Sequence, residues 1–120
     1  MLIIDDAAAI VQVLQRFLGR QGFDVAADHS AEAALSRMRG GDLPDLVIAD
    51  LVMPGIGGHE LVGIMRDEES LRGVPVVLMS GAGRSSALRR PEGDYQGWID
   101  KPFELQDLLL TVRRVLGREA

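Results

Sequence analysis

Short apolar runs alternate along the chain with longer stretches in which apolar residues recur at helical spacing. The apolar runs cover residues 1–4, 25–27, 46–49, 74–79 and 98–99. Short, nearly continuous apolar runs separated by amphipathic helices are typical of βα units, whose parallel strands are buried on both faces. The pattern therefore predicts an α/β fold built on a five-stranded parallel sheet.

The stretches between the runs carry the periodicity and boundary residues of helices. The predicted helices cover residues 10–18, about 31–38, 58–68 and 104–116. The first has an apolar face spanning about 160° at 100° per residue, which is wide for a helix that packs on one sheet. Ser30 has the side chain of an N-cap for the second helix. Leu110 lies outside the apolar stripe of the last helix, so we expect it to be exposed.

Residues 81–97 form the least regular part of the chain. Four glycines and one proline interrupt this stretch. A proline removes a backbone donor and a glycine favours turns, so only a short helix over about 85–90 fits there. We therefore expect a short or irregular fourth helix before the last strand.

The composition fits one compact domain over residues 1–120. A chain of this length buries roughly two-thirds of its unfolded surface, and the absence of cysteine excludes a disulfide scaffold or a cysteine-ligated zinc site. A formal net charge of −5 argues against a nucleic-acid partner. No apolar run approaches the ~18 residues of a membrane span, and no signal peptide is recognisable, so we expect a cytoplasmic protein without a membrane partner.

Polar and ionisable residues follow the predicted strands at their carboxyl ends. The first strand ends in Asp5 and Asp6, the third in Asp50, the fourth in Ser80, and the fifth is followed by Lys101. Ligands of open parallel sheets bind at this edge. Carboxylates that converge there repel one another, and a hard cation such as Mg²⁺ relieves that repulsion through oxygen ligands. A lysine and a hydroxyl beside them are suited to hold phosphoryl oxygens.

These residues, in this order and spacing, resemble the receiver domain of bacterial two-component response regulators, the CheY-like family. The resemblance covers essentially the whole chain and is carried by Asp5-Asp6, Asp50 within residues 49–55, Ser80, and Lys101-Pro102-Phe103 before the last helix. It implies a flavodoxin-like, doubly wound three-layer sandwich with strand order 2-1-3-4-5 and five helices. It also implies a cis peptide bond between Lys101 and Pro102.

The resemblance implies a role for each site residue. Asp50 would accept a phosphoryl group from the phosphohistidine of a sensor histidine kinase or histidine phosphotransfer protein, and Ser80 and Lys101 would contact its oxygens. The implied Mg²⁺ ligands are the side chains of Asp6 and Asp50 and the backbone carbonyl of Val52, with Asp5 acting through a metal-bound water. Such a domain is a signalling phosphoacceptor rather than an enzyme that acts on a separate substrate.

Other interpretations fit single residues of this set. The acidic pair could cap the first helix, and Asp50 could form an Asx turn. A haloacid dehalogenase-type phosphatase also uses a strand-end aspartate with Mg²⁺, but it requires a second aspartate where Val52 stands. A receiver-like domain that signals without phosphorylation is a further alternative.

Trp98 motivates that last alternative. It lies three residues before Lys101, where the family usually has a tyrosine or phenylalanine that turns inward when the hydroxyl residue, here Ser80, moves toward the phosphoryl group. Because tryptophan is larger, we expect Trp98 to stay partly exposed. The same face should carry Leu110 and contact an output partner or a second copy of the domain.

The wide apolar face of the first helix predicts a second contact surface. We expect the kinase to dock near Ile10, Val11 and Val13 together with Pro102 and Phe103, because that face exceeds what core packing requires.

Overall fold

The computed structural model describes residues 1–81 and 94–117. In these residues the strands are β1 Leu2–Ile4, β2 Ala26–Asp28, β3 Val47–Asp50, β4 Val76–Ser80 and β5 Gly97–Asp100. The helices are α1 Ala8–Arg20, α2 Ala31–Arg39, α3 Gly58–Asp67 and α4 Leu105–Val115. The short helix expected over residues 85–90 lies outside the described residues, so the last helix of the chain carries the label α4.

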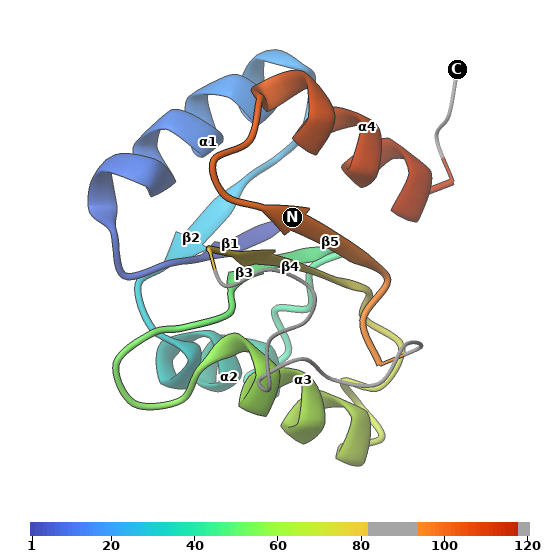
Figure 1. The fold of residues 1–120 in the computed structure, drawn as a ribbon. Coiled ribbons are helices and arrows are strands. Elements are labelled where there is room, and N and C mark those ends of the chain that lie inside the picture. The colour runs from blue at the N-terminus through green and yellow to red at the C-terminus, as the bar shows by residue number, and fades with distance from the viewer. Residues whose placement is uncertain (82–93, 118–120) are drawn as a thin grey trace.

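The five strands form one parallel sheet in the order β2-β1-β3-β4-β5. Helices α1 and α4 cover one face, and α2 and α3 cover the other, as Figure 1 shows. This arrangement confirms the doubly wound three-layer sandwich and the strand order implied by the resemblance. Because the order reverses at β1, the carboxyl ends of β1 and β3 meet at a topological switch point.

The sheet separates two apolar clusters. Leu2, Ile4 and Leu78 point toward α2 and α3, whereas Ile3 and Met79 point toward α1 and α4. All five side chains are fully buried. Burial on both faces explains why the central strands read as continuous apolar runs rather than as an alternating pattern.

Several local predictions are confirmed. The Ser30 hydroxyl accepts a hydrogen bond from the Ala33 amide at 3.1 Å and caps α2. Leu110 is 62% exposed on α4. The fourth strand begins later than its apolar run, because the Val74 amide donates to the Leu71 carbonyl in a turn (3.1 Å) before the strand starts.

The helices in the described parts of the chain are all too short or too polar to cross a membrane.

Candidate functional site

The sheet order brings the predicted site residues to one edge. Asp5 follows β1, Asp50 ends β3 and Ser80 ends β4, and these three strands are neighbours. Lys101 follows β5, next to β4, and its amide donates to the Ser80 carbonyl at 2.8 Å. The structure therefore places all of these strand ends together, as predicted from the positions at which the apolar runs stop.

Three carboxylates converge at this edge. One oxygen from each of Asp5, Asp6 and Asp50 lies within 4.8 Å of the other two. Asp5 is fully buried and Asp6 is exposed. Asp5 accepts a hydrogen bond from the Ala7 amide on Oδ1 (2.9 Å), but its buried Oδ2 has no hydrogen-bond partner among the described residues. An unsatisfied buried oxygen inside a group of oxygen ligands is a feature that a bound hard cation would explain.

Lys101 is the cation of this cluster. Its Nζ lies 3.3 Å from Asp50 Oδ1 and 3.6 Å from Asp5 Oδ2. The Lys101–Pro102 peptide bond is cis, as the resemblance implied. A single ammonium thus faces two carboxylates at close range, and the third carboxylate leaves an excess of negative charge at the edge.

The environment of Asp50 works against its ionised form. Burial raises the pKa of the Asp50 carboxyl above its ordinary value, and the negative charge of Asp5 raises it further. Lys101 lowers the pKa by its positive charge, and a hydrogen bond from the Val52 backbone amide lowers it a little more. Burial is the largest of these influences, so the ionised carboxylate is less stable here than it is in water.

Two glycines bring the first turn of α3 against the end of β3. A Cβ on Gly58 would lie 2.4 Å from the Asp50 carbonyl oxygen, and one on Gly57 would lie 2.7 Å from the Leu51 carbonyl oxygen. The sequence predicted that a helix starts at Gly58 but did not predict this contact. Here the absence of a side chain at 58 fixes the close packing that positions Asp50, and a glycine pair at a predicted helix start was the available signal.

Ser80 and Trp98 lie on the same face of the β4–β5 pair. Ser80 is 1% exposed and stands opposite Asp100 in the register. Trp98 is half-buried and its ring centroid lies 5.6 Å from that of Tyr95. The Trp98 indole N–H donates to Asp100 Oδ1 at 2.7 Å. The prediction that Trp98 is partly exposed is confirmed.

An apolar pocket of about 490 Å³ adjoins the site. It is lined by Ala9, Ile10, Val13, Leu14, Lys101, Pro102, Phe103 and Leu105. Val13 is 53% exposed. The expectation that Val11 belongs to this surface is wrong, because Val11 points into the core between α1 and the sheet and is 2% exposed.

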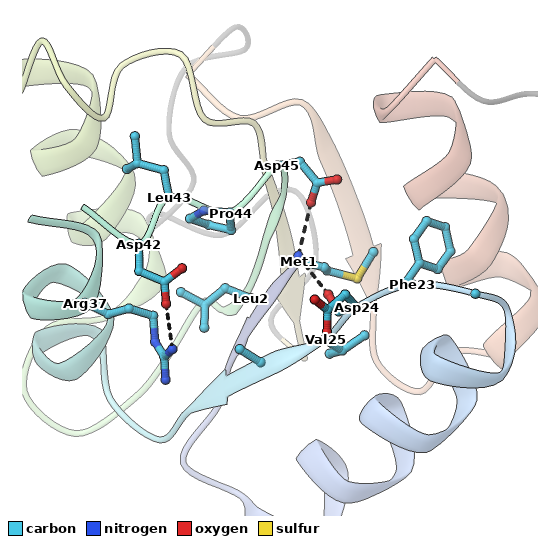
Figure 2. Close-up of a pocket in the computed structure, with 12 residues that line it drawn as sticks. Met1, Leu2, Phe23, Asp24, Val25, Arg37, Asp42, Leu43, Pro44 and Asp45 are labelled. Atoms are coloured by element: carbon cyan, nitrogen blue, oxygen red, sulfur yellow. Dashed lines mark hydrogen bonds and ion pairs between the residues drawn. The ribbon is translucent and has the colours of Figure 1, made fainter. Parts of the chain in front are cut away.

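A second pocket, of about 600 Å³, lies at the opposite edge of the sheet, around the start of β1 and β2 (Figure 2). Its lining includes two ion pairs: Arg37 contacts Asp42 at 3.0 Å, and the Met1 amino group contacts Asp45 at 3.1 Å. It contains none of the strand-end residues of the carboxyl edge. The carboxylates and Lys101 of the candidate site therefore lie at the opposite end of the sheet from this pocket.

Comparison with known proteins agrees with this geometry. A family model described as the response regulator receiver domain matches residues 1–113. Protein PetR of Rhodobacter capsulatus is 33% identical over 119 residues, which cover 98% of this chain and 48% of PetR. Response regulator PleD of Caulobacter vibrioides is 30% identical over 114 residues, which cover 94% of this chain and 24% of PleD.

Solved structures show the same likeness. A putative response regulator from Chloroflexus aurantiacus superimposes with a TM-score of 0.87 at 29% identity, covering 98% of this chain and 96% of that one. The response regulator TrrA from Thermotoga maritima, solved in complex with Mg²⁺ and beryllofluoride, gives 0.82 at 27% identity, covering 95% and 96%.

The fold and the match over residues 1–113 define a signalling module of two-component systems. The chain belongs to the response regulator receiver domain family. It spans about half or less of the length of PetR and PleD.

Proposed function

We propose that residues 1–120 form one receiver domain in which Asp50 accepts a phosphoryl group from the phosphohistidine of a sensor histidine kinase or histidine phosphotransfer protein. The observation that carries this proposal is the position of the Asp50 carboxylate, which lies 3.3 Å from Lys101 Nζ within the three-carboxylate cluster. A carboxylate is an established covalent nucleophile for phosphoryl groups.

The transfer exchanges one bond to phosphorus for another. An Asp50 oxygen forms a bond to phosphorus as the phosphorus–nitrogen bond of the donor breaks, and the imidazole keeps the bonding electron pair. Phosphoryl transfer depends mainly on in-line positioning and on neutralising charge. Lys101 supplies a positive charge for the phosphoryl oxygens, and the Ser80 hydroxyl supplies a hydrogen bond to them.

The carboxylate cluster fits a Mg²⁺ ion, which would neutralise charge on the transferring group. Asp6, Asp50 and the Val52 backbone carbonyl would bind it directly, and Asp5 through a bound water. The oxygens of the three carboxylates lie within 4.8 Å of one another, and Asp5 Oδ2 is buried without a hydrogen-bond partner among the described residues. Both features support this donor set.

The partner surfaces follow from the exposed apolar residues. We place the kinase on the 490 Å³ pocket, where Val13 and Phe103 flank Lys101 and hence the phosphorylation site. The surface around the edge strand β5, with Trp98 on the side of α2 and α3 and Leu110 on α4 at the other side, would contact an output partner or a second copy of the domain. A net charge of −5 disfavours nucleic acid as a partner of this domain. We further propose that the domain acts in the cytoplasm as a phosphoacceptor, without a membrane contact.

The central test is labelling with a small phosphodonor. The wild-type protein, incubated with Mg²⁺ and acetyl phosphate, should gain one phosphoryl group in an intact mass spectrum. Asp50→Asn should gain none, because the amide keeps the shape of the side chain and loses the nucleophile. Asp24→Asn, which changes an exposed aspartate away from the site, should label like the wild type. Stoichiometric labelling of Asp50→Asn at another residue would remove the proposal, and absence of labelling in every protein would favour signalling without phosphorylation.

A further inference from the structure

A hydrogen bond between two side chains of β5 holds Trp98 in place. Side chains two residues apart on a strand share one face, and Trp98 and Asp100 both project from the face that carries α2 and α3. The Trp98 indole N–H donates to Asp100 Oδ1 at 2.7 Å. A bond of this length to a carboxylate is a charge-assisted hydrogen bond, which is the stronger kind.

The ring is also in contact with Tyr95, at a centroid distance of 5.6 Å and an interplanar angle of 54°. Tyr95 is 6% exposed and belongs to the apolar cluster under α2 and α3. The indole therefore has an apolar contact on the side of Tyr95 and a polar contact at Asp100, which is exposed on the edge strand. Together they hold the polar edge of the indole toward solvent.

The residue opposite Trp98 on the neighbouring strand has no polar side chain that could accept this bond. Trp98 stands opposite Leu78 in the register, and Leu78 is fully buried. A ring that turned toward β4 would lose the bond to Asp100 and bury an indole N–H beside an aliphatic side chain. The hydroxyl of Ser80, on the same face of β4, could offer only a neutral hydrogen bond in place of the charge-assisted one, and neutral bonds are the weaker kind.

We propose that Asp100 is a positioning residue that keeps Trp98 in its outward orientation, so that an inward turn of the ring must first break this hydrogen bond. The first part of the proposal concerns only the hydrogen bond and the orientation of the ring. The second part, that the bond opposes activation at the site, rests on the proposed function. By linkage, a bond that disfavours the inward orientation of the ring weakens the binding of any ligand that binds more tightly when the ring is turned inward.

The first experiment uses the protein without phosphodonor. The chain has one tryptophan, so its indole N–H gives a single cross-peak in a ¹⁵N–¹H correlation spectrum. In Asp100→Ala we expect this peak to lose the downfield shift typical of a hydrogen bond, and solvent exchange of the indole proton to accelerate by roughly tenfold. Asp100→Asn keeps an oxygen acceptor, so its indole peak position and exchange rate should lie between those of Asp100→Ala and the wild type.

Asp107→Ala is the matched control, because it removes another exposed carboxylate without removing the acceptor of Trp98. Its indole peak and exchange rate should equal those of the wild type. Unchanged indole exchange in Asp100→Ala, with folding verified by circular dichroism, would overturn the positioning role outright.

The second experiment measures the affinity for beryllofluoride in the presence of Mg²⁺ by isothermal titration calorimetry. We expect Asp100→Ala to bind at least threefold more tightly than the wild type and Asp107→Ala to bind equally well. Equal affinity for Asp100→Ala would overturn the coupling to the site. If the wild type binds no beryllofluoride, the proposed function and the coupling both fail, whereas the indole exchange data still decide the positioning role.

Discussion

Neutralising Asp50 should make the folded protein more stable at neutral pH. Burial raises the pKa of this carboxyl above its ordinary value of 3.8, so the folded chain binds the proton more tightly than the unfolded chain does. The stability that the protonated group contributes is complete below about pH 4 and is lost as the pH rises through the folded pKa. At pH 7 the ionised carboxylate therefore lowers the free energy of unfolding, and Asp50→Asn removes that penalty.

The charges around Asp50 set the size of the effect. At an effective dielectric of ~20, repulsion between charges 4.8 Å apart, the largest separation within the carboxylate cluster, is about 3.5 kcal/mol. Attraction to Lys101 at 3.3 Å is about 5 kcal/mol at the same dielectric. The attraction to Lys101 exceeds the repulsion from one neighbouring carboxylate by about 1.5 kcal/mol at this dielectric, so the sign of the effect depends on the burial of Asp50, which is the largest influence on its pKa. We expect a gain of about 1–2 kcal/mol for Asp50→Asn, or roughly 4–8 °C in Tm.

Urea unfolding followed by circular dichroism, at pH 7 and at pH 3, measures this difference. The gain should be present at pH 7 and absent at pH 3, where the wild-type carboxyl is also protonated. Mg²⁺ at ten times its Kd should stabilise the wild type by about 1.4 kcal/mol and Asp50→Asn by less. Asp24→Asn, at an exposed position, should match the wild type at both pH values. A loss of stability in Asp50→Asn at pH 7, or a gain of the same size at pH 3, would refute the electrostatic reasoning.

Three further predictions test the proposed metal ligands, the proposed kinase-docking pocket and the surface around Trp98. If Asp6 binds Mg²⁺ directly and Asp5 through a water, as proposed, Asp6→Ala should weaken Mg²⁺ binding more than Asp5→Ala, for which we expect about a tenfold loss. Equal losses by calorimetry would contradict this division. Val13→Glu should slow phosphoryl transfer from the cognate kinase by at least roughly tenfold, because it places a charge in an apolar contact. Leu43 is also exposed but lies outside the docking pocket, so Leu43→Glu should leave the transfer rate unchanged. Beryllofluoride should alter residues 81–97 more than it buries Trp98; a large blue shift of Trp98 fluorescence with loss of acrylamide quenching would show the opposite.

The sequence pattern predicted the five-stranded parallel α/β sheet and the edge that carries the candidate site, because both depend on where apolar runs start and stop. The runs at 46–49 and 74–79 are strong signals, since β3 and β4 are buried on both faces. The run at 25–27 is weak because Ala26–Asp28 is a half-buried edge strand. The strand order came from the resemblance, since periodicity within a segment carries no information about which strands pair.

Side-chain geometry accounts for what the pattern could not predict. Val11 and Val13 are alike in the sequence, yet one is buried and the other is 53% exposed, because two residues on a helix are separated by about 200°. The bond between Trp98 and Asp100 depends on a rotamer, and strand alternation shows only that the two residues share a face. Gly58 was predicted only as the first residue of a helix, whereas its missing side chain also lets α3 approach the Asp50 carbonyl.

The position of Lys101 connects the site to β5. Its Nζ contacts two carboxylates at 3.3 and 3.6 Å, both longer than the roughly 2.7–2.9 Å of a strong charge-assisted hydrogen bond. Because neither contact is tight, the ammonium would move at small cost toward the phosphoryl oxygens that the proposed function places on Asp50. The backbone beneath it is held more firmly, since the Lys101 amide donates to the Ser80 carbonyl at 2.8 Å. We therefore expect phosphorylation to move the side chains at the end of β5 before it moves the backbone. Asp100, the residue before Lys101, would carry this change to Trp98, because it accepts a hydrogen bond from the indole N–H.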